Sequence, residues 1–169
     1  MDAQRLDEQF FQGDAIEIAQ LLVGKILVRC FDDGRLQRYR ITETEAYRGE
    51  EDLACHASKG RTARTEVMYH RGGKVYVYLI YGIYWMLNFV TSEEHYPAAV
   101  LIRSLEGIEG PGRVGKALQL NRSFYGEDLT LSDRIWVEDD GFKPVIAANT
   151  RIGVDYAGEW ALKKWRFGC

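Results

Sequence analysis

Residues 75–90 read V-Y-V-Y-L-I-Y-G-I-Y-W-M-L-N-F-V. Aromatic and β-branched residues are favoured in strands, and they dominate both Val75–Ile80 and Tyr84–Val90. Gly82 lies between the two segments and marks a turn or a bulge. The stretch therefore predicts two strands joined by a short connection.

The tyrosines of this hairpin allow two interpretations. Tyr76 and Tyr78 share one strand face, because side chains alternate along a strand, and Tyr81 and Tyr84 flank Gly82. They either pack in the core or form a stacking surface for planar ligands such as bases or sugars. A tyrosine beside a glycine at a hairpin tip is hard to bury, which favours the stacking surface.

Secondary-structure signals outside the hairpin predict one mixed α and β domain. Asp14 and Glu17 resemble a capping box at the start of a helix, and Gly24 stops that helix. Residues 48–74 are polar and lack a period, so they predict a long functional loop. The expected helices are Ala15–Val23, Pro111–Asn121 and a turn near Thr65–Tyr69, and the further strands are Ile26–Phe31, Arg38–Ala46, Ala98–Ser104 and Ile135–Glu138.

Composition indicates an ordinary globular protein. The 169 residues are 46% hydrophobic and 28% charged, which suits one compact domain with a sizeable core. The charged N-terminal residues do not resemble a signal peptide, and no apolar run reaches the ~20 residues that a membrane-spanning helix needs. We therefore expect a cytoplasmic protein, nucleoid-associated if bacterial, that makes no membrane contact.

Neither a metal nor a cofactor is predicted. Cys30, Cys55 and Cys169 are odd in number and widely spaced, and the histidines show no ligand spacing. The segment Gly110–Lys116 matches a phosphate-binding loop, but Ala117 stands where such a loop needs a hydroxyl for Mg²⁺.

The charge distribution is more informative than the net charge of −3. Residues 43–52 hold five acids against Arg48, whereas residues 59–74 hold five basic residues against Glu66. An acidic feature beside a basic rim fits a catalytic cleft in the path of an anionic polymer. Two solvated loops of opposite sign would give the same pattern.

At positions 41–47 the chain reads I-T-E-T-E-A-Y. An unbroken strand would place Ile41, Glu43, Glu45 and Tyr47 on one face, with the two carboxyl groups roughly 6–7 Å apart. Both glutamates could line a solvated face. Ile41 and Tyr47 argue instead that the face is partly covered, which favours one buried carboxylate that activates a water.

Several ordered motifs resemble one family. They are E-T-E-A-Y, a histidine nine residues after that tyrosine, R-T-x-R, Y-V-Y-x-x-Y-G-x-Y-x-x-x-N and V-L-I-R. Their order and spacing, from about Phe10 to Phe167, resemble the alkyladenine (3-methyladenine) DNA glycosylase family.

This resemblance implies an α/β mixed (α+β) fold, a single compact domain of residues 1–169 with a curved antiparallel sheet and a protruding β-hairpin. It also implies a monomeric, monofunctional hydrolase without a cofactor that acts on double-stranded DNA in base-excision repair. Such an enzyme flips out a damaged purine, hydrolyses its N-glycosidic bond with a Glu-activated water and leaves an abasic site. The lesions implied are 3-methyladenine, 7-methylguanine, hypoxanthine and ethenoadenine.

Matching positions suggest roles for individual residues. Glu45 corresponds to the general base and Arg103 to the arginine that helps to hold the water and the carboxylate, while a backbone carbonyl near Ile152 completes that shell. The remaining residues fall into three groups: Tyr47, His56, Tyr78 and Asn88 in the base pocket, Tyr81 as the intercalating wedge, and Arg61, Thr62, Ile83, Tyr84 and Arg122 on the flanking DNA. Glu43 receives no catalytic role and is expected to be structural.

The sequence departs from the family pattern in two places, and two alternative functions remain open. Family members usually continue beyond the R-F motif, so the resemblance suggests a truncated or naturally short C-terminus, and the connection between Leu105 and Gly110 is shorter than is common. A nucleoside N-ribohydrolase would use a similar glutamate, and a non-catalytic single-stranded nucleic-acid binder would use the same tyrosines. No side-chain acid for the release of neutral bases can be identified.

Overall fold

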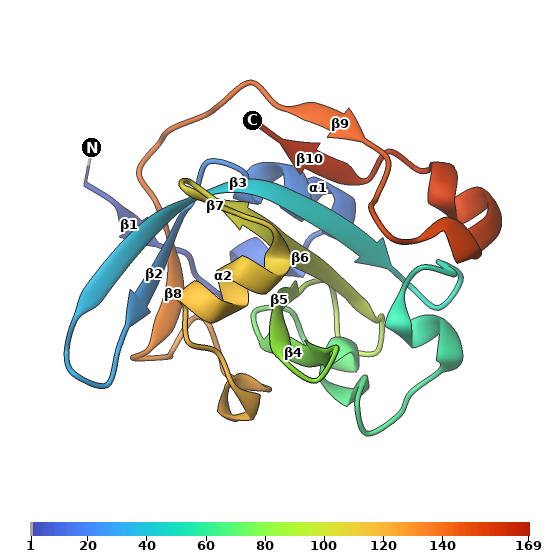
Figure 1. Ribbon diagram of the computed structural model, residues 1–169, viewed down its shortest axis with the longest axis horizontal. Coiled ribbons are helices and arrows are strands. Elements are labelled where there is room, and N and C mark those ends of the chain that lie inside the picture. Colours follow the sequence, from blue (N-terminus) through green and yellow to red (C-terminus); the bar gives the residue numbers. More distant parts are fainter. Residues whose placement is uncertain (1) are drawn as a thin grey trace.

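The longest strand, β3 (Leu36–Arg48), lies at the centre of a ten-stranded sheet in the computed structural model, which describes residues 2–169 (Figure 1). The first half of β3 pairs with β2 (Ile26–Cys30). Its second half pairs with β6 (Ala98–Leu105) along one edge and with β10 (Arg166–Gly168) along the other. The main strand order is β1-β8-β2-β3-β6-β5-β4, and every pairing is antiparallel.

The predicted fold class is confirmed. The sheet is completed by β1 (Gln4–Arg5), β4 (Val75–Ile80), β5 (Tyr84–Val90), β7 (Ile108–Glu109), β8 (Ile135–Asp139) and β9 (Ala147–Asn149). The helices are α1 (Ala15–Leu22), α2 (Pro111–Ala117) and the 3₁₀ helices η1 (Glu8–Gln12), η2 (His56–Lys59), η3 (Glu66–Tyr69), η4 (Arg122–Phe124) and η5 (Asp155–Leu162). None of the helices in residues 2–169 has the length and apolar character to cross a membrane.

A bulge in β3 changes which residues share a face. The register against β6 shifts between Ile41 and Thr44, and such irregularities bend a strand. Ile41 and Ala46 therefore both lie in the main core, although an unbroken strand would place them on opposite faces. The expectation that Ile41 shares a face with Glu45 is wrong for this reason.

The helix α1 covers one face of this part of the sheet. Its buried residues Ile18, Ala19 and Leu22 belong to the same core cluster as Ile41. The Asp14 carboxylate accepts a hydrogen bond from the amide of Ile16 and caps the helix. Thr44 donates a buried 2.8 Å hydrogen bond to the Ala19 carbonyl, which holds β3 against α1.

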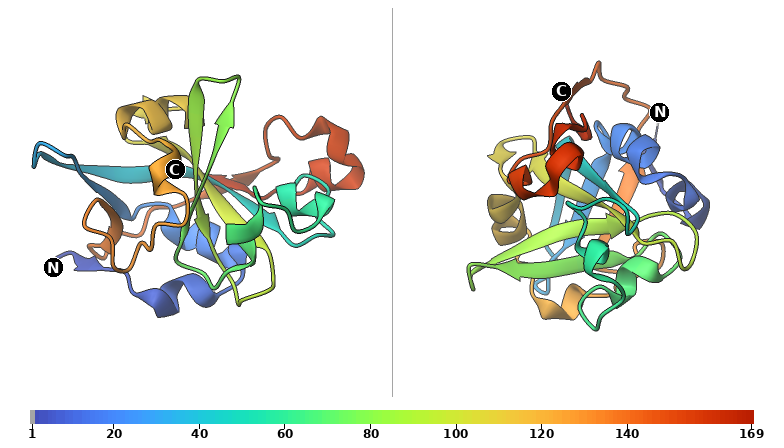
Figure 2. Two further views of the ribbon diagram at one scale, coloured as in Figure 1. Left: turned by 90° about the horizontal axis from the view of Figure 1, so that it is seen from below. Right: turned by 90° about the vertical axis from the view of Figure 1, so that its right-hand side faces the viewer.

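The β4–β5 hairpin has the predicted bounds and projects beyond the rest of the molecule (Figure 2). Tyr81 and Gly82 have φ values of 54° and 71°, and the Ile83 amide donates to the Ile80 carbonyl. Two positive φ values at the centre of such a turn suit the right-handed twist of the flanking strands. The tip therefore displays Tyr81, a residue that is 87% exposed.

The segment between β3 and β4 forms a second, smaller core on the sheet. η2 and η3 contribute Ala57, Val67, Met68 and Tyr69, which cluster with Tyr76 of β4. The predicted helical turn near Thr65–Tyr69 corresponds to η3. This loop lies opposite the end of β3 that carries Tyr47. A cavity lies between the loop and that end of the strand.

The helix α2 is shorter than predicted. It ends at Ala117, and Gln119 takes a φ of 52°, which the right-handed helix cannot continue through. Gly115 lies directly against the backbone carbonyl of Trp85, where any Cβ would clash, so α2 packs closely on β5. Because α2 packs so closely, Pro111 at its start lies at the edge of the cavity.

Candidate active site

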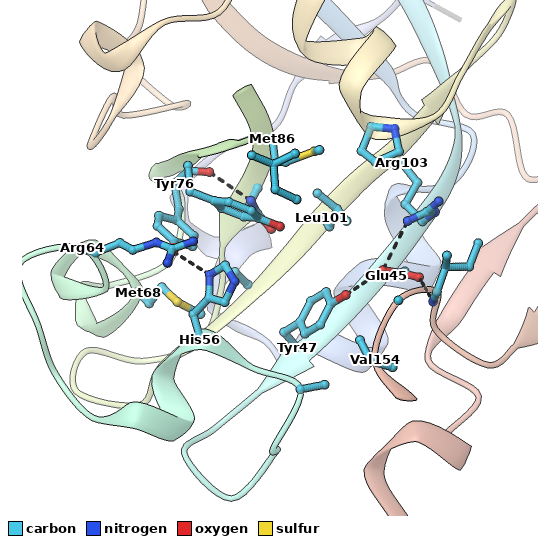
Figure 3. A pocket seen from close by; sticks show the side chains of 18 of the residues that line it. Glu45, Tyr47, His56, Arg64, Met68, Tyr76, Met86, Leu101, Arg103 and Val154 are labelled. Carbon is cyan, nitrogen blue, oxygen red and sulfur yellow. Dashed lines mark hydrogen bonds and ion pairs between the residues drawn. The ribbon is translucent and has the colours of Figure 1, made fainter. Parts of the chain in front are cut away.

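A cavity of about 290 Å³ lies between the sheet, the 49–74 loop and the segment 152–156 (Figure 3). Strands β3, β4, β5 and β6 provide its floor. Glu45 and Arg103 lie on one side of it, whereas His56, Tyr76 and Arg64 lie on the other. Its volume is near the lower end of the ~300–1,000 Å³ typical of small-molecule pockets, which suits one planar ring system.

Glu45 is a fully buried carboxylate that lines this cavity. The Tyr47 hydroxyl donates a 2.7 Å hydrogen bond to its Oε1, and the Ile152 amide donates a 2.7 Å bond to its Oε2. Nη1 of Arg103 lies 3.6 Å from Oε1. Two hydrogen-bond donors and one nearby guanidinium therefore fix the carboxylate and leave part of its acceptor capacity for a ligand or a water.

Two opposing effects act on the pKa of Glu45. Burial raises it and is the larger effect, while Arg103, the Ile152 amide, the Tyr47 hydroxyl and Arg151 lower it. The net result is a raised pKa, which is the property of a carboxylate that can accept a proton.

Arg103 connects Glu45 with Glu43, the first glutamate of the E-T-E motif. Its Nε donates to Oε1 of Glu43 at 3.1 Å, while its Nη1 faces Glu45. Glu43 also forms a 2.9 Å ion pair with Arg166 of β10. Glu43 and Glu45 thus do share a face, and Glu43 holds two arginines rather than facing the cavity.

The segment that carries Ile152 is fixed by a buried ion pair. Arg151 and Asp52 are both fully buried side chains with N–O distances of 2.7 and 2.9 Å. Arg151 also donates to the carbonyls of Ala46 and Trp160. Its guanidinium lies 4.9 Å from the Tyr47 ring, so the same residue supports the Ile152 amide and the back of Tyr47.

The opposite end of the cavity is aromatic. His56 meets Tyr78 edge-on at 4.5 Å, and its Nδ1 lies 2.8 Å from the Tyr76 hydroxyl. Burial, and then the charge of Arg64, lower the pKa of His56 to about 4, so its imidazole is neutral at pH 7. Burial raises the pKa of Tyr78 to about 12, so its ring carries no charge at neutral pH.

Asn88 lies at the floor of the cavity with only 3% of its surface exposed. Its Nδ2 donates to the Tyr76 carbonyl at 3.2 Å, which fixes the orientation of the amide. Within residues 2–169, no three His, Cys, Asp or Glu side chains gather as metal ligands would.

A family model described as methylpurine-DNA glycosylase matches residues 9–110 and 106–169 of the chain. The chain belongs to this family. It is therefore a DNA glycosylase, a hydrolase of N-glycosyl bonds that acts on alkylated purines in base-excision repair.

Curated relatives cover nearly the whole chain, and each carries the name "Putative 3-methyladenine DNA glycosylase". A protein from Methanocella arvoryzae is 47% identical over 182 residues, which cover 96% of this chain and 90% of the relative. A protein from Psychrobacter cryohalolentis is 44% identical over 186 residues, which cover 91% of this chain and 88% of the relative. A protein from Natranaerobius thermophilus is 41% identical over 188 residues, which cover 96% of this chain and 94% of the relative.

The structure of the glycosylase brings most of the predicted site residues together around one cavity. Those that line it are Glu45, Tyr47, His56, Tyr78, Tyr81, Asn88, Arg103 and Ile152. The Ile152 amide contacts Glu45 directly, and the expected role of a carbonyl near Ile152 in holding the water stays a prediction.

The predicted DNA-contact residues of the glycosylase lie outside the cavity lining. Ile83 and Tyr84 follow Tyr81 on the exposed hairpin, with 67% and 37% exposure. Arg61 and Thr62 lie on the loop before η3, where Arg61 pairs with Glu66 at 2.7 Å. Arg122 is exposed on η4.

Sequence reasoning missed several residues of the glycosylase site. Arg64 and Tyr76 were visible in the motifs R-T-x-R and Y-V-Y, but nothing placed them in the cavity. Tyr156 also lines the cavity, from the glycine-rich segment near the C-terminus. The pairing of Asp52 with Arg151 spans 99 residues and leaves no local signal.

Proposed function

We propose that this glycosylase draws a damaged purine nucleotide out of duplex DNA into the cavity and hydrolyses its N-glycosidic bond with a water activated by Glu45. The observation that carries this proposal is the state of Glu45, a buried carboxylate that lines the cavity, accepts two hydrogen bonds, lies beside the Arg103 guanidinium and has a raised pKa. Flipping is required because the sugar C1′ and the base are not accessible inside the stack.

In this proposal the cavity binds the flipped base. Tyr47 and Tyr78 sandwich the purine, and His56 faces its edge. Asn88 disfavours normal guanine through its amino group, because the Asn88 amide is already oriented by the Tyr76 carbonyl, whereas 7-methylguanine is released through its weakened glycosidic bond despite that group. The support is the presence of these four side chains around one 290 Å³ cavity.

Tyr81 is assigned the wedge role. It fills the space that the flipped nucleotide leaves, because it is displayed at the tip of the projecting hairpin and also lines the cavity rim. Contacts to the flanking strand are assigned to Arg61, Thr62, Ile83, Tyr84 and Arg122. Their positions on the hairpin, the adjacent loop and η4 support this assignment.

The chemistry is hydrolytic in this proposal. The water oxygen attacks C1′ while Glu45 accepts a proton, and Arg103 keeps the carboxylate oriented and ionised. Each carboxylate oxygen already accepts one hydrogen bond, Oε1 from the Tyr47 hydroxyl and Oε2 from the Ile152 amide, so the water binds at the acceptor capacity that remains. None of the described residues that line the cavity is a lysine, which favours a monofunctional enzyme that leaves an intact abasic strand.

The lesions proposed are 3-methyladenine, 7-methylguanine, hypoxanthine and ethenoadenine. Neither alternative from the sequence gains support. Membership of a DNA glycosylase family disfavours free nucleosides as substrates. A non-catalytic binder would have no use for a buried carboxylate with a raised pKa.

Single-turnover base release tests the proposal. The protein is mixed in excess with duplex DNA that carries one hypoxanthine or one 7-methylguanine, and abasic sites are revealed with alkali. We expect release by the wild type, strands that stay intact until alkali is added, and a loss of about 10²–10⁴-fold in Glu45→Gln with lesion binding retained. Glu106→Gln, an exposed carboxylate outside the cavity, is the control. Equal release by Glu45→Gln and wild type would overturn the mechanism.

A further inference from the structure

The end of the cavity opposite Glu45 carries a cation with no carboxylate partner. Arg61 on the same loop pairs with Glu66, but Arg64 forms no ion pair within residues 2–169. Instead it lines the cavity, and its guanidinium carbon lies 5.2 Å from the centre of the Tyr78 ring. Figure 3 shows Arg64 extending beside Tyr76 toward His56.

The charge of Arg64 acts on three titratable side chains at this end of the cavity. It lowers the pKa of His56 and opposes the burial that raises the pKa values of Tyr76 and Tyr78. The purine must place its C1′ near Glu45, so the rest of the base extends toward His56, Tyr76 and Arg64. A guanidinium is a permanent cation with a rigid fork of donors, and no acid here satisfies it.

We propose that Arg64 is a specificity residue that selects neutral damaged purines with two adjacent acceptors on one edge over cationic N7-alkylated purines. This inference rests on the proposed function and concerns the same cavity. Hypoxanthine is the lesion that fits, because its O6 and N7 form the acceptor pair that arginine binds bidentately on guanine. A 7-alkylpurine has lost the N7 acceptor and carries a positive charge that Arg64 repels.

Arg64 also provides what the release of a neutral base requires. As water bonds to C1′ and Glu45 takes its proton, the C1′–N9 bond breaks and its electron pair stays on the purine. Hypoxanthine then leaves as an anion whose charge spreads to N7 and O6, and it takes a proton from solvent afterwards. Donors fixed at those atoms stabilise the charge that develops in the transition state.

Cationic lesions gain nothing from such a donor. A 7-alkylated or 3-alkylated purine leaves as a neutral molecule, so no negative charge develops for Arg64 to stabilise. Their release therefore depends on the weak glycosidic bond and on Glu45 rather than on attraction by the cavity. The electron-rich rings that would favour a cation are offset, because Tyr78 already has a guanidinium 5.2 Å from its centre.

The test compares two lesions with the same protein sample. Single-turnover rate constants are measured on duplexes with one hypoxanthine or one 7-methylguanine, for wild type, Arg64→Gln and Arg64→Lys. We expect Arg64→Gln to lower hypoxanthine release at least about tenfold, the effect of one lost bidentate pair, and to leave 7-methylguanine release unchanged or faster. Arg64→Lys keeps the charge without the fork, so hypoxanthine release falls and 7-methylguanine release stays at the wild-type rate.

The ratio of the two rate constants separates specificity from general effects. Misfolding or weaker duplex binding lowers both rate constants together. Lys59→Gln removes a neighbouring charge that does not line the cavity, so it should leave the ratio unchanged. A ratio in Arg64→Gln equal to that of wild type, with both bases released, would overturn the role of Arg64. If wild type releases neither base, the proposed function itself fails.

Discussion

The Tyr47 hydroxyl donates a 2.7 Å hydrogen bond to Oε1 of Glu45. Tyr47 is a proposed wall of the base pocket and Glu45 the proposed general base, so binding and chemistry share one hydrogen-bonded pair. The bond stabilises the ionised carboxylate and is one of the effects that lower the pKa of Glu45 against burial.

Tyr47→Phe should shift the acid limb of the activity profile. The ring remains for stacking, but the lost hydroxyl lets the pKa of Glu45 rise further above its ordinary value of 4.5. Glu45 acts as a carboxylate, so activity in the variant should fall at a higher pH than in wild type. Single-turnover rates across pH would show this shift, with less than about tenfold loss on the alkaline side. Coincident acid limbs would mean that the bond does not tune Glu45.

Glu45→Gln should stabilise the protein at neutral pH. Because the pKa of Glu45 is raised by folding, the protonated form favours the folded state, and that stabilisation is lost as the pH rises through the folded pKa. The amide mimics the protonated carboxyl at every pH. The Tm of the variant should therefore exceed that of wild type at pH 7, and the difference should vanish below pH 4.5. A lower Tm at pH 7 would contradict the raised pKa.

Local signals in the sequence predict the hairpin and the first helix well. Val75–Ile80 and Tyr84–Val90 have the predicted bounds, because strand propensity and a glycine turn act within a few residues. The bulge between Ile41 and Thr44 was not predictable, since it depends on how β3 registers with β6. The short strands β9 and β10 likewise exist only through pairing with each other and with β3.

In the candidate site, too, the sequence motifs identified residues but not the contacts between residues far apart in the chain. Motif resemblance found Glu45, Tyr78 and Arg103, and the structure gathers them around one cavity. It could not reveal that Glu43 bridges Arg103 and Arg166, because Glu43 and Arg166 are 123 positions apart. Charged residues far apart in a chain have many possible partners, and only the fold selects among them.

Glu43 should act as a positioning residue through Arg103. Its carboxylate holds Nε of Arg103 at 3.1 Å while Nη1 faces Glu45. Glu43→Ala frees that guanidinium, so base release should fall about ten- to a hundredfold while duplex affinity stays at the wild-type value. Glu43→Gln keeps an acceptor and should recover part of the rate. A merely structural residue would instead lower Tm without this recovery, so both rate and Tm are measured.

Tyr81→Ala should weaken the distinction between damaged and normal DNA. Tyr81 is 87% exposed at the hairpin tip, so removing its ring leaves the fold intact but removes the group that we propose stacks in the gap left by the flipped nucleotide. Aromatic stacking on a base contributes about 1–3 kcal/mol. Binding to a hypoxanthine duplex should weaken accordingly, while binding to an undamaged duplex changes little. Tyr81→Phe retains the ring and should behave as wild type.

Asp52 and Arg151 form a buried ion pair, and Arg151 directly precedes Ile152 in the chain, so we expect both stability and the position of Ile152 to depend on this pair. Asp52→Ala leaves a buried guanidinium without its partner, which should lower the free energy of unfolding by about 3–5 kcal/mol in urea titrations. Glu66→Gln breaks the exposed pair with Arg61 and serves as the control, with little change expected.

A double variant separates the two contributions of this pair. Replacing both residues with apolar ones, as in Asp52→Leu with Arg151→Met, removes both buried charges and should restore much of the stability. It cannot restore the hydrogen bonds from Arg151 to the carbonyls of Ala46 and Trp160. The Ile152 amide should then no longer hold Oε2 of Glu45, so base release should remain well below wild type although the protein is folded. Full recovery of both stability and base release would show that the ion pair serves the fold alone.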